Sequence, residues 1–212
     1  MEIICHRGLW RTKASQNKIP AILDAFKKGF GVEIDLRLNR QGEIYLAHDR
    51  EENPKTLLSN LFQKLSLSSA FQEYPIMALH IKEDTPEMFD KLTRLVDPTN
   101  KLIIFGLSNE SKEKYAEVFG WSKIAYELET GLIGSLLGAY KGKEGVVWLV
   151  ERGWTLGLDE YNKIKHKKIY YITPEIIGFK KKLTESHLAC LTGICTDDPF
   201  FYKNIIDKHD PF

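Results

Sequence analysis

Two acidic residues, Glu33 and Asp35, stand inside the apolar stretch "GVEIDL" at residues 31–36. If this stretch is a strand, a spacing of two residues points both side chains to the same face. Two carboxylates that are buried together repel each other unless a cation balances their charge. Hard divalent metals such as Mg²⁺ or Ca²⁺ take oxygen ligands and would supply that charge. The alternative is that the two acids form salt bridges with neighbouring cations such as Arg7 and Lys82.

Two histidines stand at the ends of other short apolar runs. His6 and Arg7 follow "EIIC", and His48 follows "EIYLA". In a displacement at phosphorus, one histidine can remove a proton from the nucleophile while a second gives a proton to the leaving oxygen. Arg7 and Lys82 would bind the phosphate oxygens and balance the charge that develops there. We therefore predict that His6 and His48 form a general acid–base pair.

Short apolar runs alternate with longer amphipathic ones along the whole chain, which predicts strands alternating with helices. The predicted strands are residues 2–5, 31–36, 43–47, 76–81, 102–106, 123–127, 146–149, 169–172 and 192–195. The predicted helices are residues 20–29, 55–65, 85–97, 109–119, 130–140, 157–164 and 175–182. Thr85 is the expected N-cap of the third helix, with Pro86 in its first turn.

One connection is too short to be a crossover. Only six residues separate Leu36 from Glu43, whereas parallel strands need a connection of roughly a dozen residues or more. These two segments are therefore predicted to form an antiparallel hairpin that turns at about 40–42 and returns His48 beside the carboxylates. The remaining eight strands predict a (β/α)₈ TIM barrel, whose active site lies at the carboxyl ends of the strands. A doubly wound open sheet is the second interpretation.

Composition narrows the class of protein. The chain has 212 residues, 43% of them hydrophobic, and no linker-like segment, so we expect a single domain over residues 1–212. A net charge of +1 argues against a dedicated nucleic-acid-binding protein. Three cysteines without paired metal spacing favour a reduced, cytoplasmic setting. We expect no signal peptide before the first strand, and no apolar run approaches the ~18 residues of a membrane span. The sequence does not indicate an oligomeric state.

Taken together, the motifs "HRG", "EID", "HD", "IK" and the closing "GICTDDP" resemble the glycerophosphodiester phosphodiesterase family, in that order, over nearly the whole chain. The stretches "HRGLW", "GFGVEIDLR" and "GVVWL" are most similar to its short bacterial members, which are often associated with surface-polysaccharide genes. The resemblance implies a (β/α)₈ barrel and a metal-dependent phosphodiesterase acting on a glycerophosphodiester or related alcohol-linked phosphodiester. The roles that it implies are acid–base catalysis for His6 and His48, metal binding for Glu33 and Asp35, phosphate contact for Arg7 and Lys82, and a site-lining amide for Asn17.

Two positions depart from the family's pattern. Gln16 stands where the family commonly has a glutamate before Asn17, so one charge is missing. His80 stands where an acidic residue usually completes the metal site. His80 could itself be a ligand, water could take the ligand's place, or metal binding could be weakened, with Glu127 and Glu129 as candidates for a replacement carboxylate. We expect His80 to be the third ligand and Mg²⁺ the cofactor, with Ca²⁺ or Mn²⁺ as alternatives.

Late in the chain, Trp148 is expected at the mouth of the barrel, where it could pack against a glycerol or sugar. Ordinary packing is an equally good interpretation for Trp148, and also for Tyr171 and Glu175. Asp197 is expected to line the mouth or cap the last turn, and a direct part in catalysis is the alternative. Two other functions stay open: a catalytically weak phosphate-binding barrel with an impaired metal site, and a lyase that forms a cyclic phosphate.

Overall fold

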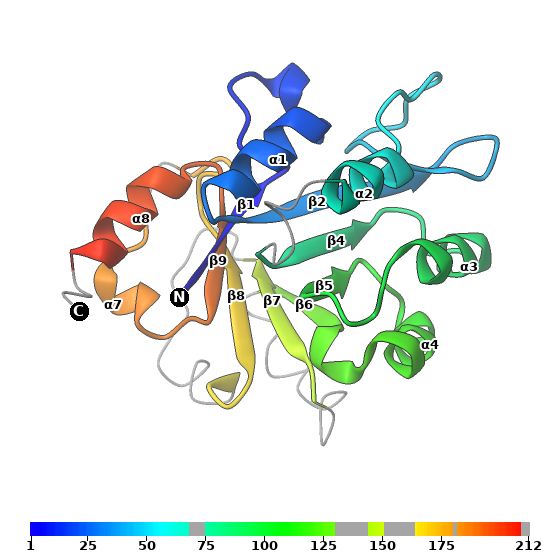
Figure 1. The fold of residues 1–212 in the computed structure, drawn as a ribbon. Coiled ribbons are helices and arrows are strands. Elements are labelled where there is room, and N and C mark those ends of the chain that lie inside the picture. The colour runs from blue at the N-terminus through cyan, green and yellow to red at the C-terminus, as the bar shows by residue number, and fades with distance from the viewer. Residues whose placement is uncertain (68–74, 130–143, 151–163, 180–181, 209–212) are drawn as a thin grey trace.

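The computed structural model of the chain describes residues 1–67, 75–129, 144–150, 164–179 and 182–208. Strands and helices alternate along these residues (Figure 1). The strands are β1 (Glu2–His6), β2 (Gly31–Leu38), β3 (Ile44–Leu46), β4 (Met77–Ile81), β5 (Leu102–Phe105), β6 (Ala125–Glu129), β7 (Val146–Val150), β8 (Lys168–Ile172) and β9 (Gly193–Thr196). The helices are α1 (Ile19–Lys27), α2 (Leu58–Ser66), α3 (Pro86–Leu95), α4 (Asn109–Phe119), α7 (Glu185–Leu188) and α8 (Pro199–Asp207), with 3₁₀ turns η1 (Lys13–Ser15) and η3 (Trp121–Lys123).

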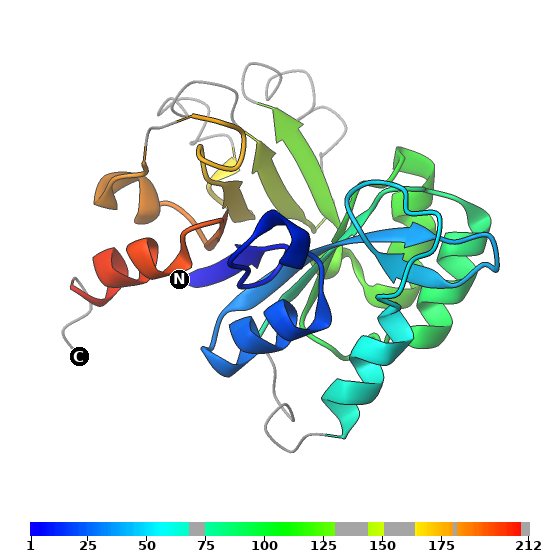
Figure 2. The same cartoon turned by 90° about the horizontal axis from the view of Figure 1, so that it is seen from above.

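Eight of the strands form a nearly closed parallel barrel. Their order is β5-β4-β2-β1-β9-β8-β7-β6, and every neighbouring pair on this path runs parallel. The two ends of the sheet meet where Ile104 of β5 forms a parallel bridge with Ile124, just before β6. Seen from above, the strands curve round a common centre with helices outside them (Figure 2). The predicted TIM barrel is therefore confirmed, and the open sheet is excluded.

The ninth strand, β3, lies outside this path and pairs antiparallel with β2. Leu36 is opposite Leu46, and Leu38 is opposite Ile44. One step further, the N–H of Ala47 donates to the carbonyl of Asp35 over 3.2 Å. His48 therefore follows β3 at the level of the second carboxylate.

Alternation along the strands separates two sets of buried side chains. Outward-facing residues of β2 and β4, such as Ile34 and Leu79, pack against α1, α2 and α3 in a large apolar cluster. Inward-facing residues, including Ile4, Ala78 and Trp148, form a second cluster inside the barrel. Since both faces of these parallel strands are buried, polar side chains on the inner face need a specific reason to be there.

Helix boundaries follow local signals where those signals are strong. Thr85 caps α3 by accepting a hydrogen bond of 3.2 Å from the N–H of Met88, as predicted. The predicted helix at 175–182 is wrong over its described residues, 175–179 and 182. Residues 174–178 form turns, with Gly178 at a φ of +89°. The helices α7 and α8 were not predicted. The predicted helices at 130–140 and, apart from its last residue, 157–164 lie outside the described residues.

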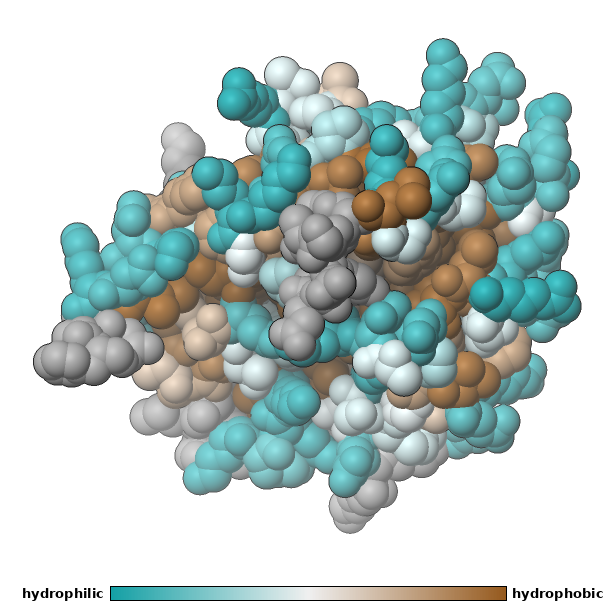
Figure 3. Space-filling model, in the orientation of Figure 1, coloured by the Kyte–Doolittle hydropathy of each residue, from teal (hydrophilic) through white to brown (hydrophobic). Residues whose placement is uncertain are grey.

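Hydrophilic side chains project over much of the face shown in Figure 3, with apolar side chains visible between them. Across the part of the chain that the structure describes, no helix combines the length and apolar character needed to cross a bilayer.

Candidate active site

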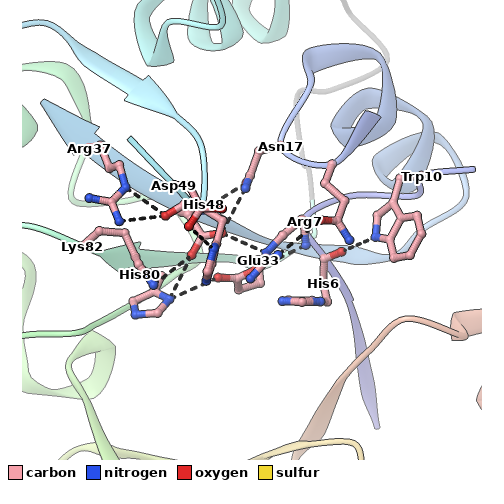
Figure 4. Close-up of polar contacts among 12 residues, drawn as sticks. His6, Arg7, Trp10, Asn17, Glu33, Arg37, His48, Asp49, His80 and Lys82 are labelled. Carbon is pink, nitrogen blue, oxygen red and sulfur yellow. Dashed lines mark hydrogen bonds and ion pairs between the residues drawn. The ribbon is translucent and has the colours of Figure 1, made fainter. Parts of the chain in front are cut away.

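The carboxyl ends of β1, β2 and β4 bring the predicted acidic and basic residues side by side (Figure 4). The strand register sets His6 opposite Glu33, and Asp35 opposite His80. Because alternate residues of a strand share a face, Glu33 and Asp35 both point into this end of the barrel. Lys82 lies two residues after His80, just past the end of β4, and therefore points to the same face. The parallel register therefore assembles a cluster of residues that lie far apart in the sequence.

Asp35 lies at the centre of this cluster, with only 1% of its surface exposed. Its Oδ2 is 2.9 Å from Nε of Arg7 and accepts a 2.9 Å hydrogen bond from the side-chain amide of Asn17. Its Oδ1 is 3.1 Å from Nδ1 of His80 and 3.7 Å from Nζ of Lys82. Burial disfavours the charged carboxylate, but the contacts with His80, Arg7 and Asn17 outweigh it and hold the pKa of Asp35 well below its usual value. Asp35 is therefore ionised at neutral pH.

His80 is the basic partner shared by both acids. Its Nδ1 lies 3.1 Å from Asp35 Oδ1 and 3.6 Å from Glu33 Oε1, and its ring stacks on Phe105 with the centroids 4.5 Å apart. Burial, and to a smaller degree Lys82, lowers the pKa of His80. The hydrogen bonds to Asp35 and Glu33 raise it by more, so that the pKa reaches about 9. At neutral pH and without a metal ion, His80 is an imidazolium that balances the two carboxylates.

Glu33, Asp35 and His80 also fit a divalent metal ion. One ligand atom from each residue can be chosen so that all three lie within 4.8 Å of one another. Oδ1 of Asp35 is buried and has two basic groups near it, Nδ1 of His80 at 3.1 Å and Nζ of Lys82 at 3.7 Å, so a cation that displaced the His80 proton would find this oxygen free to bind it. Two carboxylates and an imidazole suit Mg²⁺ or Mn²⁺. Since imidazole ligates a metal only in its neutral form, the cation must displace the proton of His80.

The segment after β1 aims Arg7 and Asn17 at Asp35. Both residues adopt left-handed backbone conformations, with φ of 59° and 56°, which cost about 1 kcal/mol for residues other than glycine and are best tolerated by asparagine. Between them Gly8 has a φ of +90°, and an added Cβ would lie 2.9 Å from a backbone carbon of α1. Nη1 of Arg7 donates to Oε1 of Gln16 over 3.2 Å. Because the Gln16 amide is neutral, it holds the guanidinium without cancelling its charge.

His48 is held mainly through its backbone. Nε and Nη2 of Arg37 donate to the carbonyl of His48 over 2.9 and 2.7 Å. Glu83 in turn accepts from Nη1 of Arg37 over 2.9 Å and from Arg50 over 3.0 Å. Within the described part of the chain, the polar contact of the imidazole is with the adjacent Asp49. Nδ1 of His48 is 2.9 Å from Oδ1 of Asp49, and that carboxylate is 89% exposed. Arg37 is not among the predicted site residues, because nothing in its local spacing connects it to a backbone atom across the hairpin.

His6 has a carboxylate partner from the other end of the chain. Nδ1 of His6 lies 2.8 Å from Oδ1 of Asp197, which follows β9. Trp10, which sequence analysis also missed, donates its indole N–H to the carbonyl of His6 over 2.9 Å. The side chain of His6 is 13% exposed, so it is largely enclosed but still reachable.

A cavity of about 810 Å³ opens beside these residues. Four of the predicted site residues line it: His6, Arg7, Asn17 and His48. Trp10, Glu175 and Asp197 line it as well. Because Arg7 also contacts Asp35, the wall of the cavity is continuous with the carboxylate cluster. The structure thus brings both histidines, the arginine and the candidate metal ligands to one place.

Trp148 lies elsewhere. Its side chain is 1% exposed and packs inside the barrel in a stack between Phe105 and Tyr170 rather than along the cavity. Tyr171 is also buried, in an apolar cluster of β6–β9 with the C-terminal helices. Glu127 is exposed and does not belong to the group of candidate metal ligands found among the described residues. The side chain of Glu129 lies outside the described part.

No protein-family model and no curated protein sequence matches the chain. Solved structures do match over almost its full length. A glycerophosphodiester phosphodiesterase from Agrobacterium tumefaciens is 14% identical, with a TM-score of 0.63, over 98% of this chain and 99% of that one. A phosphodiesterase from Oleispira antarctica, in complex with the product sn-glycerol-3-phosphate, is 15% identical, with a TM-score of 0.61, over 98% and 97%. A glycerophosphoryl diester phosphodiesterase from Parabacteroides distasonis is 14% identical, with a TM-score of 0.52, over 98% and 86%. At these identities the likeness is one of fold.

Proposed function

We propose that this chain, which has the fold of the glycerophosphodiester phosphodiesterases, is a metal-dependent phosphodiesterase that acts as one domain over residues 1–212. One observation carries the proposal. His6, Arg7 and His48 line a single cavity, and the Arg7 side chain also contacts the buried carboxylate of Asp35. The same cavity therefore offers two proton-transfer groups, a fixed guanidinium and an anionic cluster suited to a metal ion.

In this proposal, the two histidines move the protons of the reaction. One imidazole takes the proton of the attacking hydroxyl or water, and the other donates a proton to the departing alkoxide. The phosphorus–oxygen bond to the nucleophile forms as the bond to the alcohol breaks. Attack by water releases one alcohol and one phosphate monoester, whereas attack by the substrate's own hydroxyl releases one alcohol and one cyclic phosphate. We leave open which histidine is the acid, and the experiment below decides it.

Arg7 and Lys82 would bind the non-bridging phosphate oxygens. Both are anchored by Asp35, with Nε of Arg7 2.9 Å and Nζ of Lys82 3.7 Å from its carboxylate oxygens. A cation that is already held in place costs little further ordering when charge develops on the phosphate. Glu33, Asp35 and His80 would hold the divalent metal, Mg²⁺ in our proposal, which supplies further positive charge next to the phosphate when it is bound. Asn17 keeps Asp35 in position through the amide.

The substrate class is a glycerophosphodiester or a related alcohol-linked phosphodiester. It is supported by the Oleispira antarctica structure, which carries sn-glycerol-3-phosphate as product. We also propose a reducing, cytoplasmic setting, which is supported by three free cysteines, two of them buried.

The test is a panel of phosphodiesters, including glycerophosphocholine and a p-nitrophenyl phosphodiester, with Mg²⁺, Mn²⁺, Ca²⁺ or EDTA. Phosphorus NMR follows the products. We expect metal-dependent formation of a phosphate monoester, and loss of at least about 100-fold in kcat for His6→Ala and for His48→Ala on glycerophosphocholine. Nitrophenolate leaves without being protonated, so the variant that lacks the acid should keep most of its activity on that ester.

His166→Ala is the matched control, because it removes an exposed histidine that does not line the cavity. Full activity of both His6→Ala and His48→Ala would refute the acid–base pair. A cyclic phosphate as the only product would make the protein a lyase. Binding of inorganic phosphate without turnover under any metal would make it a binding protein.

A further inference from the structure

The acid–base pair proposed above leaves the carboxylate of Asp197 without a role. From the sequence, Asp197 is expected to line the mouth of the barrel or cap the last turn, with a direct part in catalysis as the alternative. In the structure its Oδ1 lies 2.8 Å from Nδ1 of His6. The pairing of the two strands explains this contact. Cys5 of β1 is opposite Thr196 of β9, so the residues that follow them, His6 and Asp197, lie next to each other.

Asp197 stands on a fixed backbone. Thr196 before it is fully buried and donates its hydroxyl to Glu175 over 2.6 Å. Asp198 after it caps α8, accepting from the N–H of Phe201 over 3.3 Å, while its own N–H donates to the Thr196 hydroxyl over 2.9 Å. A residue held between a buried threonine and a helix N-cap has little freedom to leave its partner.

The other histidine is held differently. The side chains of His48 and its adjacent Asp49 are 45% and 89% exposed, whereas those of His6 and Asp197 are 13% and 27% exposed. An ion pair between exposed side chains orders little, because water competes for both groups. A carboxylate can therefore orient His6 in a way that Asp49 cannot orient His48.

A neutral imidazole carries one proton, and the partner of one ring nitrogen decides where that proton lies. A carboxylate at Nδ1 accepts the proton of that nitrogen as a hydrogen bond. The other nitrogen, Nε2, is then left unprotonated and free to exchange a proton with the substrate.

We propose that Asp197 is a positioning residue that holds His6 in the Nδ1–H tautomer with Nε2 available to the cavity. The inference rests on the proposed function in one respect only, namely that His6 exchanges a proton during the reaction. The orientation of the ring itself can be measured without any substrate.

The first measurement is nitrogen NMR of the histidine side chains of the wild-type protein at pH 8, with His6 assigned by comparison with His6→Ala. We expect Nδ1 of His6 to be protonated and Nε2 unprotonated. In Asp197→Asn, whose side-chain amide can donate to Nδ1, the Nε2–H tautomer should appear. A wild-type His6 protonated at Nε2 would overturn the proposal, whether or not the protein turns over any phosphodiester.

The second measurement is kinetic. Asp197→Asn and Asp197→Ala should lower kcat about 10- to 100-fold on glycerophosphocholine, with KM changed less than about threefold. The matched control is Asp24→Asn, which removes an exposed carboxylate from α1 outside the cavity lining. If both Asp197 variants keep the wild-type kcat while His6→Ala loses it, the acid–base pair stands and the role of Asp197 is refuted. A Tm close to that of the wild type shows that each variant is folded, and the wild-type NMR result decides the question if one is not.

Discussion

Raising the pH should destabilise the metal-free protein through His80. The perturbation is a change from pH 6 to pH 9.5 in EDTA, applied to the wild type and to His80→Asn. The asparagine amide can still donate from about the position of Nδ1 but does not titrate. Because the contacts with Asp35 and Glu33 raise the pKa of His80 from 6.5 to about 9, the folded state binds its proton more tightly than the unfolded state.

The sign and size follow from that difference. Stability contributed by the protonated ring is fully present below pH 6.5 and is lost as the pH rises through about 9. At about 1.4 kcal/mol for each pKa unit, a rise from 6.5 to about 9 contributes at most about 3.5 kcal/mol. The side chain of His80 is 24% exposed, and solvent screens part of this amount. We therefore expect a loss of about 2 kcal/mol.

The assay is urea unfolding at several pH values, with the free energy of unfolding of His80→Asn subtracted from that of the wild type. The difference should shrink by about 2 kcal/mol between pH 6 and pH 9.5. His166→Asn controls for the loss of one imidazole, and because it keeps His80 it should keep the pH dependence of the wild type. A difference that stays constant to within about 0.5 kcal/mol over this range would refute the placement of His80 between the two acids.

Three other predictions follow from the site. Metal binding at pH 7.5 should release nearly one proton, because the cation must displace the proton of His80. Calorimetry in two buffers of different ionisation enthalpy measures the number of protons released. Equal heats of binding in the two buffers would mean that His80 is not a ligand. Arg37→Lys should lower kcat at least about tenfold with a smaller change in KM, because a lysine cannot make both hydrogen bonds that hold the carbonyl of His48. Steady-state kinetics on glycerophosphocholine test this expectation. An unchanged kcat would show that His48 does not need these hydrogen bonds to stay in position. Gly8→Ala should lower the free energy of unfolding by about 2 kcal/mol or more, since φ is positive and the new Cβ would overlap the backbone of Ala21. Urea unfolding measures the loss. A change below about 0.5 kcal/mol would contradict the described turn.

The amino-acid sequence alone determined the features that depend on local spacing. Two acids spaced by two on an apolar run must share a face if the run is a strand, and "EID" could be interpreted without knowing its neighbours. The count of eight parallel strands followed from connection lengths, which are also local. Thr85 as the cap of α3 needed only the residues beside it.

Tertiary structure decided which side chains meet. The partners of His6 and His80 depend on strand register and on which strands are neighbours, and both are set by packing across the whole barrel. Arg37 binds the backbone carbonyl of His48. Since every residue has a backbone carbonyl, the residue types of the sequence cannot indicate this contact. The buried position of Trp148 follows from its inward parity on β7 at a level where neighbouring strands supply Phe105 and Tyr170 to stack on it. Short-range patterns determine to which face of its own strand a side chain points. Its burial and its neighbouring side chains depend on contacts between distant parts of the chain.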